Sequence, residues 1–245
     1  MKIVKFSILT TVSLIIFSAF VFYDDNNTDN SKPYEPEMVF VEGGTFTMGS
    51  TIDKPAYQAT LNSFRIGKFA VTQAQWVAVM GNNPSVFQKG DNYPVENVNW
   101  YDAQEFITKL NILTGKNYRL PTDTEWEYAA RGGSKSKGYK YSGSNNLDDV
   151  AWFDDNSGKS THPVGTKQPN ELGIYDMSGN VWEWCSDYHL VEIPCMFPNC
   201  PSYQHSRVMR GGCWINGCGG YSEYSCASQT QRRDNFGFRL ILPFD

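Results

Sequence analysis

The sequence predicts an α+β fold with short strands, about three helices and much irregular structure. Aromatic residues make up 15% of the 245 residues, and 21 Gly and 12 Pro favour a turn-rich chain over a helical bundle. Only three segments combine apolar residues at helical spacing with capping signals, whereas strand-like runs stand at both ends of the predicted domain. A hydrophobic content of 40% at this length is enough for a large buried core.

The domain is expected to open with a hairpin over residues 38–48 and to close with a strand over residues 236–242. The first segment reads MVFVEGGTFTM, with Gly43-Gly44 as the tight turn, because glycine adopts positive φ without steric cost. The last segment reads FGFRLIL. Pairing of this closing strand with the hairpin would bring the two ends of the domain together.

The first two predicted helices each begin at a polar residue and end at a glycine. Thr72 is the expected N-cap of a helix that ends at Gly81. The second helix begins at Asn99 or Asp102 and ends at Gly115, its expected C-cap. Its apolar residues recur at helical spacing and predict a core-facing stripe: Trp100, Ala103, Phe106, Ile107 and Leu110.

The third predicted helix has the clearest start. Thr122 and Glu125 form a capping box after Pro121, and Arg131-Gly132-Gly133 is expected to end the helix. The next segment, 134–158, is rich in Ser, Gly, Asn and Asp and lacks periodicity, which predicts an ordered loop.

The stretch Asn170–Tyr188, NELGIYDMSGNVWEWCSDY, is expected to organise the fold. In an extended chain Trp182 and Trp184 would point to one face and Glu183 to the other. A carboxylate beside so much aromatic surface needs a partner, because a buried unpaired charge is unfavourable. Glu183 either caps backbone N–H groups, which the residues alone favour, or forms a calcium site with Asn180 and neighbouring carbonyls.

The N-terminus predicts export. Lys2 and Lys5 precede an uncharged run over residues 6–23, which is typical of a signal peptide and marginal for a membrane span. The chain then divides into a signal peptide or N-terminal membrane anchor (residues 1–23), a flexible tether (24–37) and one folded domain (38–245). The domain would be periplasmic, on the cell surface or secreted.

The net charge and the cysteine content restrict the kinds of partner and metal that the protein is expected to bind. A formal net charge of −5 without a Lys/Arg run argues against nucleic-acid binding. An even number of cysteines in an exported protein predicts disulfides of undetermined pairing, and three scattered histidines show no zinc-ligand spacing. All six cysteines lie in the last quarter of the chain: Cys185, Cys195, Cys200, Cys213, Cys218 and Cys226.

Several motifs in a fixed order resemble one family, the formylglycine-generating enzyme or sulfatase-modifying factor domain, a variant of the C-type lectin-like fold. They span nearly the whole expected domain. The resemblance implies the fold, and the site has to be argued separately because one fold hosts many functions. The matching segments are Val41–Phe46, Met48-Gly49, Val71-Thr72 with Trp76, Pro94-Val95 with Val98 and Trp100, Arg119–Thr122, Glu125–Gly133, Asn170–Trp184, Arg210–Gly212 and Gly237–Arg239.

Formylglycine-generating enzymes oxidise a cysteine of a sulfatase peptide with copper(I) held between two cysteines, because soft thiolates suit that metal. The resemblance places these two positions at Asn216 and Tyr221, and neither side chain can replace a thiolate. Cys213 and Cys218 have the same separation but stand three residues earlier after Arg-Gly-Gly. We therefore expect a non-catalytic module that binds a ligand or partner. The alternative is a copper-dependent oxidase of exported sulfatases, with Cys213 and Cys218 as displaced ligands.

The expected binding surface is the segment Cys213–Asn235, because its aromatic residues are of the kind enriched in binding loops. The same segment varies in retroelement-diversified surface proteins that resemble the family, which gives a second alternative. Residues 215–222 are all reachable from asparagine codons by changes at adenines. An iron-dependent sulfoxide synthase is disfavoured because the chain lacks a histidine cluster. The candidate ligand-binding residues are Trp214, Asn216, Tyr221 and Tyr224.

The resemblance also implies structural calcium, held by loops where regular secondary structure is sparse. The first site would use Asn180, Val181 and Glu183, and the second, a weaker match, would use Asn146, Leu147 and Asp154.

Overall fold

The computed structural model describes residues 32–49, 56–189, 206–216 and 224–244. Residues 32–245 fold as one compact unit. The expected signal peptide or anchor, residues 1–23, lies outside the described residues. Within the described ranges, no helix has the length and apolar character needed to cross a membrane.

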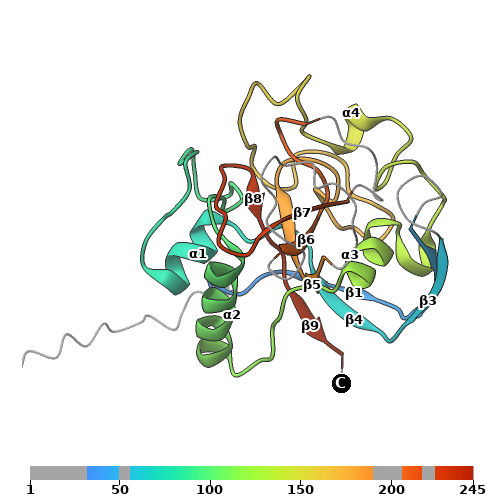
Figure 1. Ribbon diagram of the computed structural model, residues 1–245, viewed down its shortest axis with the longest axis horizontal. Coiled ribbons are helices and arrows are strands. Elements are labelled where there is room, and N and C mark those ends of the chain that lie inside the picture. Colours follow the sequence, from blue (N-terminus) through green and yellow to red (C-terminus); the bar gives the residue numbers. More distant parts are fainter. Residues whose placement is uncertain (1–31, 50–55, 190–205, 217–223, 245) are drawn as a thin grey trace, which may run out of the picture. The chain divides into compact units, whose positions relative to one another are not determined.

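The ends of the domain meet in a small antiparallel sheet (Figure 1). Strand β4 (Phe64–Gly67) lies between β1 (Met38–Val41) and β9 (Ile241–Pro243). The expected closing strand is broken, because β8 (Phe236–Gly237) pairs in a different sheet and only β9 returns to the opening strands. The prediction that the ends meet is therefore confirmed, with β4 rather than a hairpin as the partner of β9.

The predicted opening hairpin is wrong. Strand β2 (Gly44–Met48) pairs with β3 (Tyr57–Leu61), whereas β1 pairs with β4, so the chain crosses between two sheets at Gly43. A Cβ at Gly43 would lie 2.5 Å from the Leu61 carbonyl oxygen. The glycine is required there by close backbone approach and not by a tight turn.

The three predicted helices are confirmed as α1 (Gln73–Met80), α2 (Trp100–Thr114) and α3 (Asp123–Ala130). Each begins with a capping box, and Asn99 rather than Asp102 is the N-cap of α2 because Asp102 occupies the third helical position and bonds back to the cap. The expected loop 134–158 contains one short helix, α4 (Leu147–Val150), and its start overlaps a second helical turn, η1 (Gly133–Lys135).

The main sheet has the order β7-β6-β5-β8 and lies at the centre of the domain. It consists of β5 (Trp182–Tyr188), β6 (Ser206–Arg210), β7 (Tyr224–Ser228) and β8. Figure 1 shows α1 and α2 to one side of this sheet and α3 to the other. Trp182 and Trp184 pack in the core with α1 and α2, while Cys185 packs in the core with α3. The expected alternation along β5 is thus confirmed.

Part of the predicted flexible tether lies on the folded domain. Tyr34 packs against the core beside α1 and α2, and Glu35 forms an ion pair with Lys116 at 3.0 Å. Glu37 pairs with Lys68 at 2.8 Å. Residues 32–37 therefore belong to the domain, and residues 24–31 lie outside the described residues.

Candidate functional site

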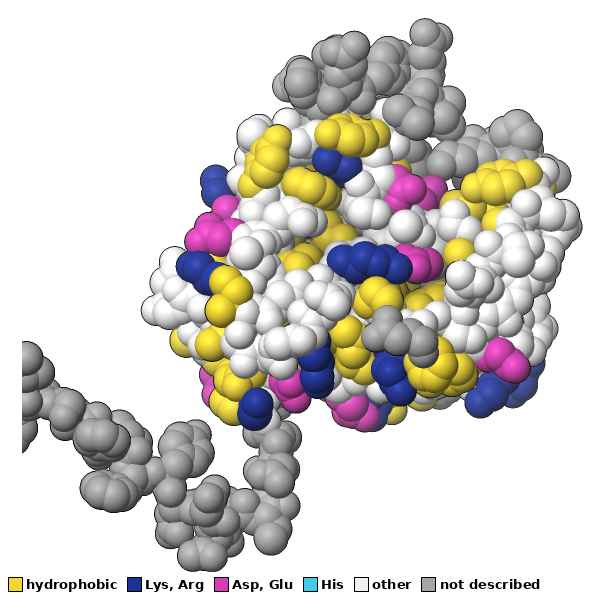
Figure 2. Space-filling view, turned by 90° about the horizontal axis from the view of Figure 1, so that it is seen from below, with side chains coloured by type: hydrophobic (Ala, Val, Ile, Leu, Met, Phe, Trp, Pro, Cys, Tyr) yellow, Lys and Arg dark blue, Asp and Glu magenta, His cyan; other side chains and the backbone are white. Residues whose placement is uncertain are grey.

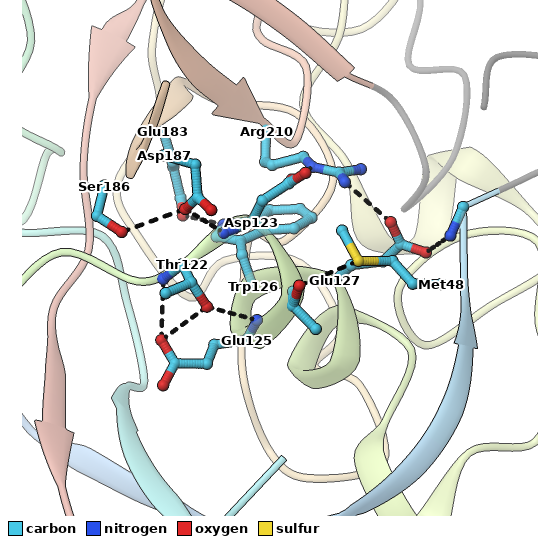
Figure 3. A network of polar contacts seen from close by, with 12 residues as sticks. Met48, Thr122, Asp123, Glu125, Trp126, Glu127, Glu183, Ser186, Asp187 and Arg210 are labelled. Atoms are coloured by element: carbon cyan, nitrogen blue, oxygen red, sulfur yellow. Dashed lines mark hydrogen bonds and ion pairs between the residues drawn. The ribbon is translucent and has the colours of Figure 1, made fainter. Parts of the chain in front are cut away.

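Buried ion pairs fix the end of β6, where the Arg-Gly-Gly motif begins (Figure 3). The Arg210 guanidinium bonds to the Asp123 carboxylate and, at 2.9 Å, to the Glu127 carboxylate. Burial alone would lower the pKa of Arg210, but the charges of Asp123 and Glu127 raise it well above its ordinary value. Glu127 also pairs with Arg131 at 2.6 Å. Helix α3 thereby holds the start of the segment that contains the candidate site residues.

The two glycines after Arg210 carry the chain across α3. Gly211 and Gly212 have φ values of 101° and 74°, in the left-handed region that favours glycine. A Cβ at Gly211 would lie 3.2 Å from the Trp126 indole. The positive φ values and this tight contact both favour glycine in the turn that leads into Cys213.

Cys213 is a fully buried thiol rather than a disulfide partner. Asn235 Nδ2 donates to its Sγ at 3.2 Å, and Asn216 Oδ1 lies 3.5 Å from the same atom. Cys218 and Tyr221 lie outside the described residues, so the displaced copper pair stays a prediction. Cys226 is disulfide-bonded, and Cys185, like Cys213, is a buried thiol. The pairing of the remaining cysteines stays a prediction, because Cys195, Cys200 and Cys218 lie outside the described ranges.

Trp214 is less available to a ligand than its sequence position suggests. The side chain is 5% exposed, and its indole N–H donates to the Asp234 carbonyl at 3.1 Å. The Phe87 ring meets it edge to face, with 5.3 Å between the ring centroids. Its neighbour Ile215 is 53% exposed. The expectation of an adaptable Trp214 contact is corrected: the indole is a fixed wall, and Ile215 provides the exposed apolar surface.

A cavity of about 280 Å³ lies against this wall, lined by Asp154, Ser157, Lys159, Trp214 and Ile215. Ser157 Oγ donates to the Trp214 carbonyl at 2.7 Å and so joins the loop at 154–159 to the segment after Arg-Gly-Gly. Sequence reasoning did not connect these two segments. Tyr221 and the Tyr224 side chain lie outside the described part of the chain.

The Glu183 carboxylate, the expected calcium ligand, is paired with side chains in this structure. Its two carboxylate oxygens accept from Arg239 at 2.6 Å each, and Oε2 also accepts from the Trp126 indole N–H at 2.7 Å. Asn180 Oδ1 is used by the His162 backbone N–H at 3.0 Å. A cation would have to compete with a buried arginine for the same oxygens. The backbone-capping interpretation of Glu183 is corrected by the same contacts, because its partners are side chains.

The second expected calcium set is not assembled as a cluster of acidic ligands. Asn146 Nδ2 donates to Asp149 at 3.0 Å, and Asp154 lies at the cavity described above. In the part of the chain that the structure describes, no three His, Cys, Asp or Glu side chains gather to hold a metal ion. Calcium at Asn146, Leu147 and Asp154 stays a prediction from resemblance.

Glu96 supports the Phe87 side of the Trp214 wall and should make stability depend on pH. Its Oε1 accepts from the Phe87 backbone N–H at 2.8 Å, while Oε2 is buried without a hydrogen-bond partner among the described residues. Burial raises the pKa of Glu96 from 4.5 to about 7, and backbone hydrogen bonds from Phe87 and Val86 oppose the shift. Folding therefore favours the protonated acid.

We expect Glu96 to lower stability by about 3 kcal/mol as the pH rises from 4.5 to about 7, with no further loss above that range. Below pH 4.5 both states hold the proton, whereas between the two pKa values only the folded chain keeps it. Urea titrations across this range should show Glu96→Gln to be the more stable protein at neutral pH. Asp176, whose pKa burial raises to about 6, cancels in the difference between wild type and variant. A constant difference at all pH values would contradict the assignment.

Comparison with known proteins places the chain among relatives of one family. The model of the Sulfatase-modifying factor enzyme 1-like domain matches residues 24–243. The chaperone protein LppX of Paenibacillus barcinonensis is 39% identical over 78% of this chain and 82% of its own length. The formylglycine-generating enzyme of Streptomyces coelicolor is 35% identical over 63% of this chain and 54% of the enzyme. This chain thus spans only about half the length of that enzyme.

A solved structure agrees with this likeness. Treponema denticola variable protein 1 superposes with a TM-score of 0.76 and 31% identity, covering 84% of this chain and 95% of that protein.

Proposed function

The chain belongs to the sulfatase-modifying factor family, and we propose that it is an exported, non-catalytic member that binds a polypeptide partner. One observation carries the proposal. Asn216 stands where the resemblance places a copper ligand, and its carboxamide lies 3.5 Å from the Cys213 thiol. A carboxamide is a poor ligand for copper(I), which selects thiolates, so the oxidase chemistry lacks one of its two ligands.

Two relatives support a binding role. The relative with 39% identity is named a chaperone protein, and the solved structure with 31% identity is a variable protein. Both similarities extend over more than three quarters of this chain. A partner-binding function on this scaffold is compatible with a replaced copper ligand, because a rigid domain can present loops without catalysing a reaction.

We assign partner contact to the cavity beside Ile215. An exposed aliphatic side chain next to a fixed indole wall suits an apolar side chain of the partner. Asp154 and Lys159 place opposite charges among the residues that line it. This composition favours a peptide segment with an apolar residue between charged neighbours. The uncharged run over residues 6–23 supports export, and export in turn favours disulfides among the cysteines other than Cys185 and Cys213.

Copper chemistry provides the first test. The reduced domain should show no thiolate-dependent copper(I) binding, and a sulfatase-type CxPxR peptide incubated with domain and copper under air should keep its mass. The formylglycine-generating enzyme of Streptomyces coelicolor is the positive control. Tight one-to-one copper binding with an aldehyde product would establish the oxidase alternative, and loss of both in Cys213→Ser would identify the displaced ligand.

Substitution of Ile215 provides the second test. Short displayed peptides selected on the wild-type domain should bind Ile215→Asp roughly tenfold more weakly or worse, because a charge replaces apolar contact. Asp155→Asn, which changes an exposed acid that does not line the cavity, should bind as wild type does. Equal affinity for wild type and Ile215→Asp would exclude this cavity as the binding site.

A further inference from the structure

A second cavity, of about 360 Å³, lies where β9 and the end of α2 meet. It shares no residue with the cavity beside Ile215. Leu242, Pro243 and Phe244 supply apolar lining, and Arg65 and Lys116 supply positive charge. No acidic side chain lines it among the described residues. Lys116 pairs with Glu35 at 3.0 Å, so Arg65 is the cation that this apolar cavity offers to a partner that is apolar and anionic at once.

The aromatic residues beside this cavity are exposed. Phe40 and Phe244 are each 46% exposed, and their ring centroids lie 5.0 Å apart. The Arg65 guanidinium lies 4.9 Å from the centroid of the Phe244 ring, which fixes a cation against an exposed apolar group. In the described ranges Arg65 forms no ion pair with a carboxylate. We call Phe40, Arg65, Lys116 and Phe244 the basic aromatic face.

Figure 2 looks at the domain from the side on which β9 ends in Figure 1. Hydrophobic and basic side chains lie next to one another there, between scattered acidic groups. Exposed aromatic rings with Lys or Arg beside them are the combination by which proteins sit at the interface of an anionic membrane. Contiguous exposed apolar groups of this kind mark surfaces that contact a membrane or another protein.

The N-terminal segment gives the reason to choose a membrane as that partner. Residues 32–37 run past this face, because Glu35 pairs with Lys116 at 3.0 Å. Only eight residues, 24–31, separate Lys32 from the predicted anchor run, and fully extended they span at most about 29 Å. A domain tethered so closely meets lipid at a high effective concentration, so even a weak surface contact would be populated.

We propose that the basic aromatic face rests on the anionic surface of the membrane that holds the N-terminal segment. This inference rests on the predicted anchor and is separate from partner binding at Ile215. Phe40 and Phe244 insert among the headgroups, while Arg65 contacts lipid phosphates. Such an orientation would leave Ile215 and its cavity, built from other elements, for the partner.

Vesicle sedimentation of residues 32–245, the compact unit without the predicted anchor, tests the proposal. The unit should sediment with vesicles of phosphatidylcholine mixed with phosphatidylglycerol and much less with phosphatidylcholine alone. Arg65→Gln should weaken binding roughly fivefold, as expected for one interfacial charge. The double variant Phe40→Ser/Phe244→Ser should reduce binding at least as much. Glycerol phosphate should not compete, because a soluble headgroup offers no apolar surface.

Two control variants test whether vesicle binding depends on the basic aromatic face rather than on any exposed cation or apolar side chain. Lys140→Gln removes a cation from another cation–aromatic pair, 4.9 Å from the Tyr141 centroid, and Val86→Ser removes a different exposed apolar side chain. Both should bind vesicles as wild type does. Thermal melting confirms that each variant is folded. Equal binding to neutral and anionic vesicles, wild-type binding by the face variants, or competition by glycerol phosphate would each overturn the proposal.

Discussion

Arg239→Met should lower the free energy of unfolding by about 3–5 kcal/mol, because it leaves the buried Glu183 carboxylate without its counterion. Arg239 and Glu183 are 0% and 1% exposed and pair at 2.6 Å. The same guanidinium donates to the Gly67 and Tyr175 carbonyls at 3.0 Å each. One side chain thus joins β4, the loop before β5 and β5 itself. Equilibrium unfolding in urea measures the loss.

The double variant Glu183→Gln/Arg239→Met isolates the charge effect. Glutamine keeps an acceptor for the Trp126 indole N–H, which Glu183 accepts at 2.7 Å in the wild type. We expect the double variant to be more stable than Arg239→Met, because no unpaired charge remains buried. Equal losses in the single and double variants would show that packing, and not charge, dominates the effect.

Calcium titration of the wild type and of Glu183→Gln distinguishes the Glu183–Arg239 ion pair from a calcium site at Glu183. If Arg239 is the partner of Glu183, calcium does not bind to this carboxylate. Millimolar calcium or a chelator should then leave the unfolding midpoint of the wild type unchanged. A stabilisation by calcium that disappears in Glu183→Gln would contradict the ion-pair assignment and return Asn180, Val181 and Glu183 to the calcium prediction.

Local patterns predicted the helices well, and contacts distant in the sequence were missed. The capping boxes of α1, α2 and α3 involve residues three apart, so the sequence contains the whole signal. Glu183 and Arg239 are 56 residues apart, and no periodicity links them. A signal was nevertheless present: an arginine in the apolar run FGFRLIL must find a buried acceptor, and Glu183 stands in a similarly apolar run.

The candidate site was predicted only in part, because it too depends on contacts between residues distant in the sequence. The motif order located the segment after Arg-Gly-Gly, but it could not show that the loop at Asp154–Lys159 packs against Trp214 and Ile215. The hairpin error has a local cause. Gly43-Gly44 is a good turn signal, and only the tertiary approach of the Leu61 carbonyl shows why glycine is needed there.

Arg210→Met should also lower the free energy of unfolding by about 3–5 kcal/mol. The guanidinium is 2% exposed and bonds to both Asp123 and Glu127, so its removal leaves two carboxylates at the α3–β6 contact with one cation fewer. Glu127 retains Arg131, and Asp123, in the first turn of α3, retains the favourable helix dipole. Urea unfolding measures the total loss, to which Asp123 should contribute most.

Arg119→Met is the matched control, because Arg119 pairs with Glu125 on the same helix at 2.6 Å but its side chain is 40% exposed. We expect a smaller loss than for Arg210→Met, because Glu125, although only 10% exposed, keeps the hydrogen bonds from the Thr122 backbone N–H and hydroxyl when Arg119 is removed. Arg210 also positions Gly211, Gly212 and the wall at Trp214, so Arg210→Met should weaken peptide binding beside Ile215 even where the domain remains folded. A loss of stability no larger than that of Arg119→Met would show that Arg210 is not the buried anchor of this segment.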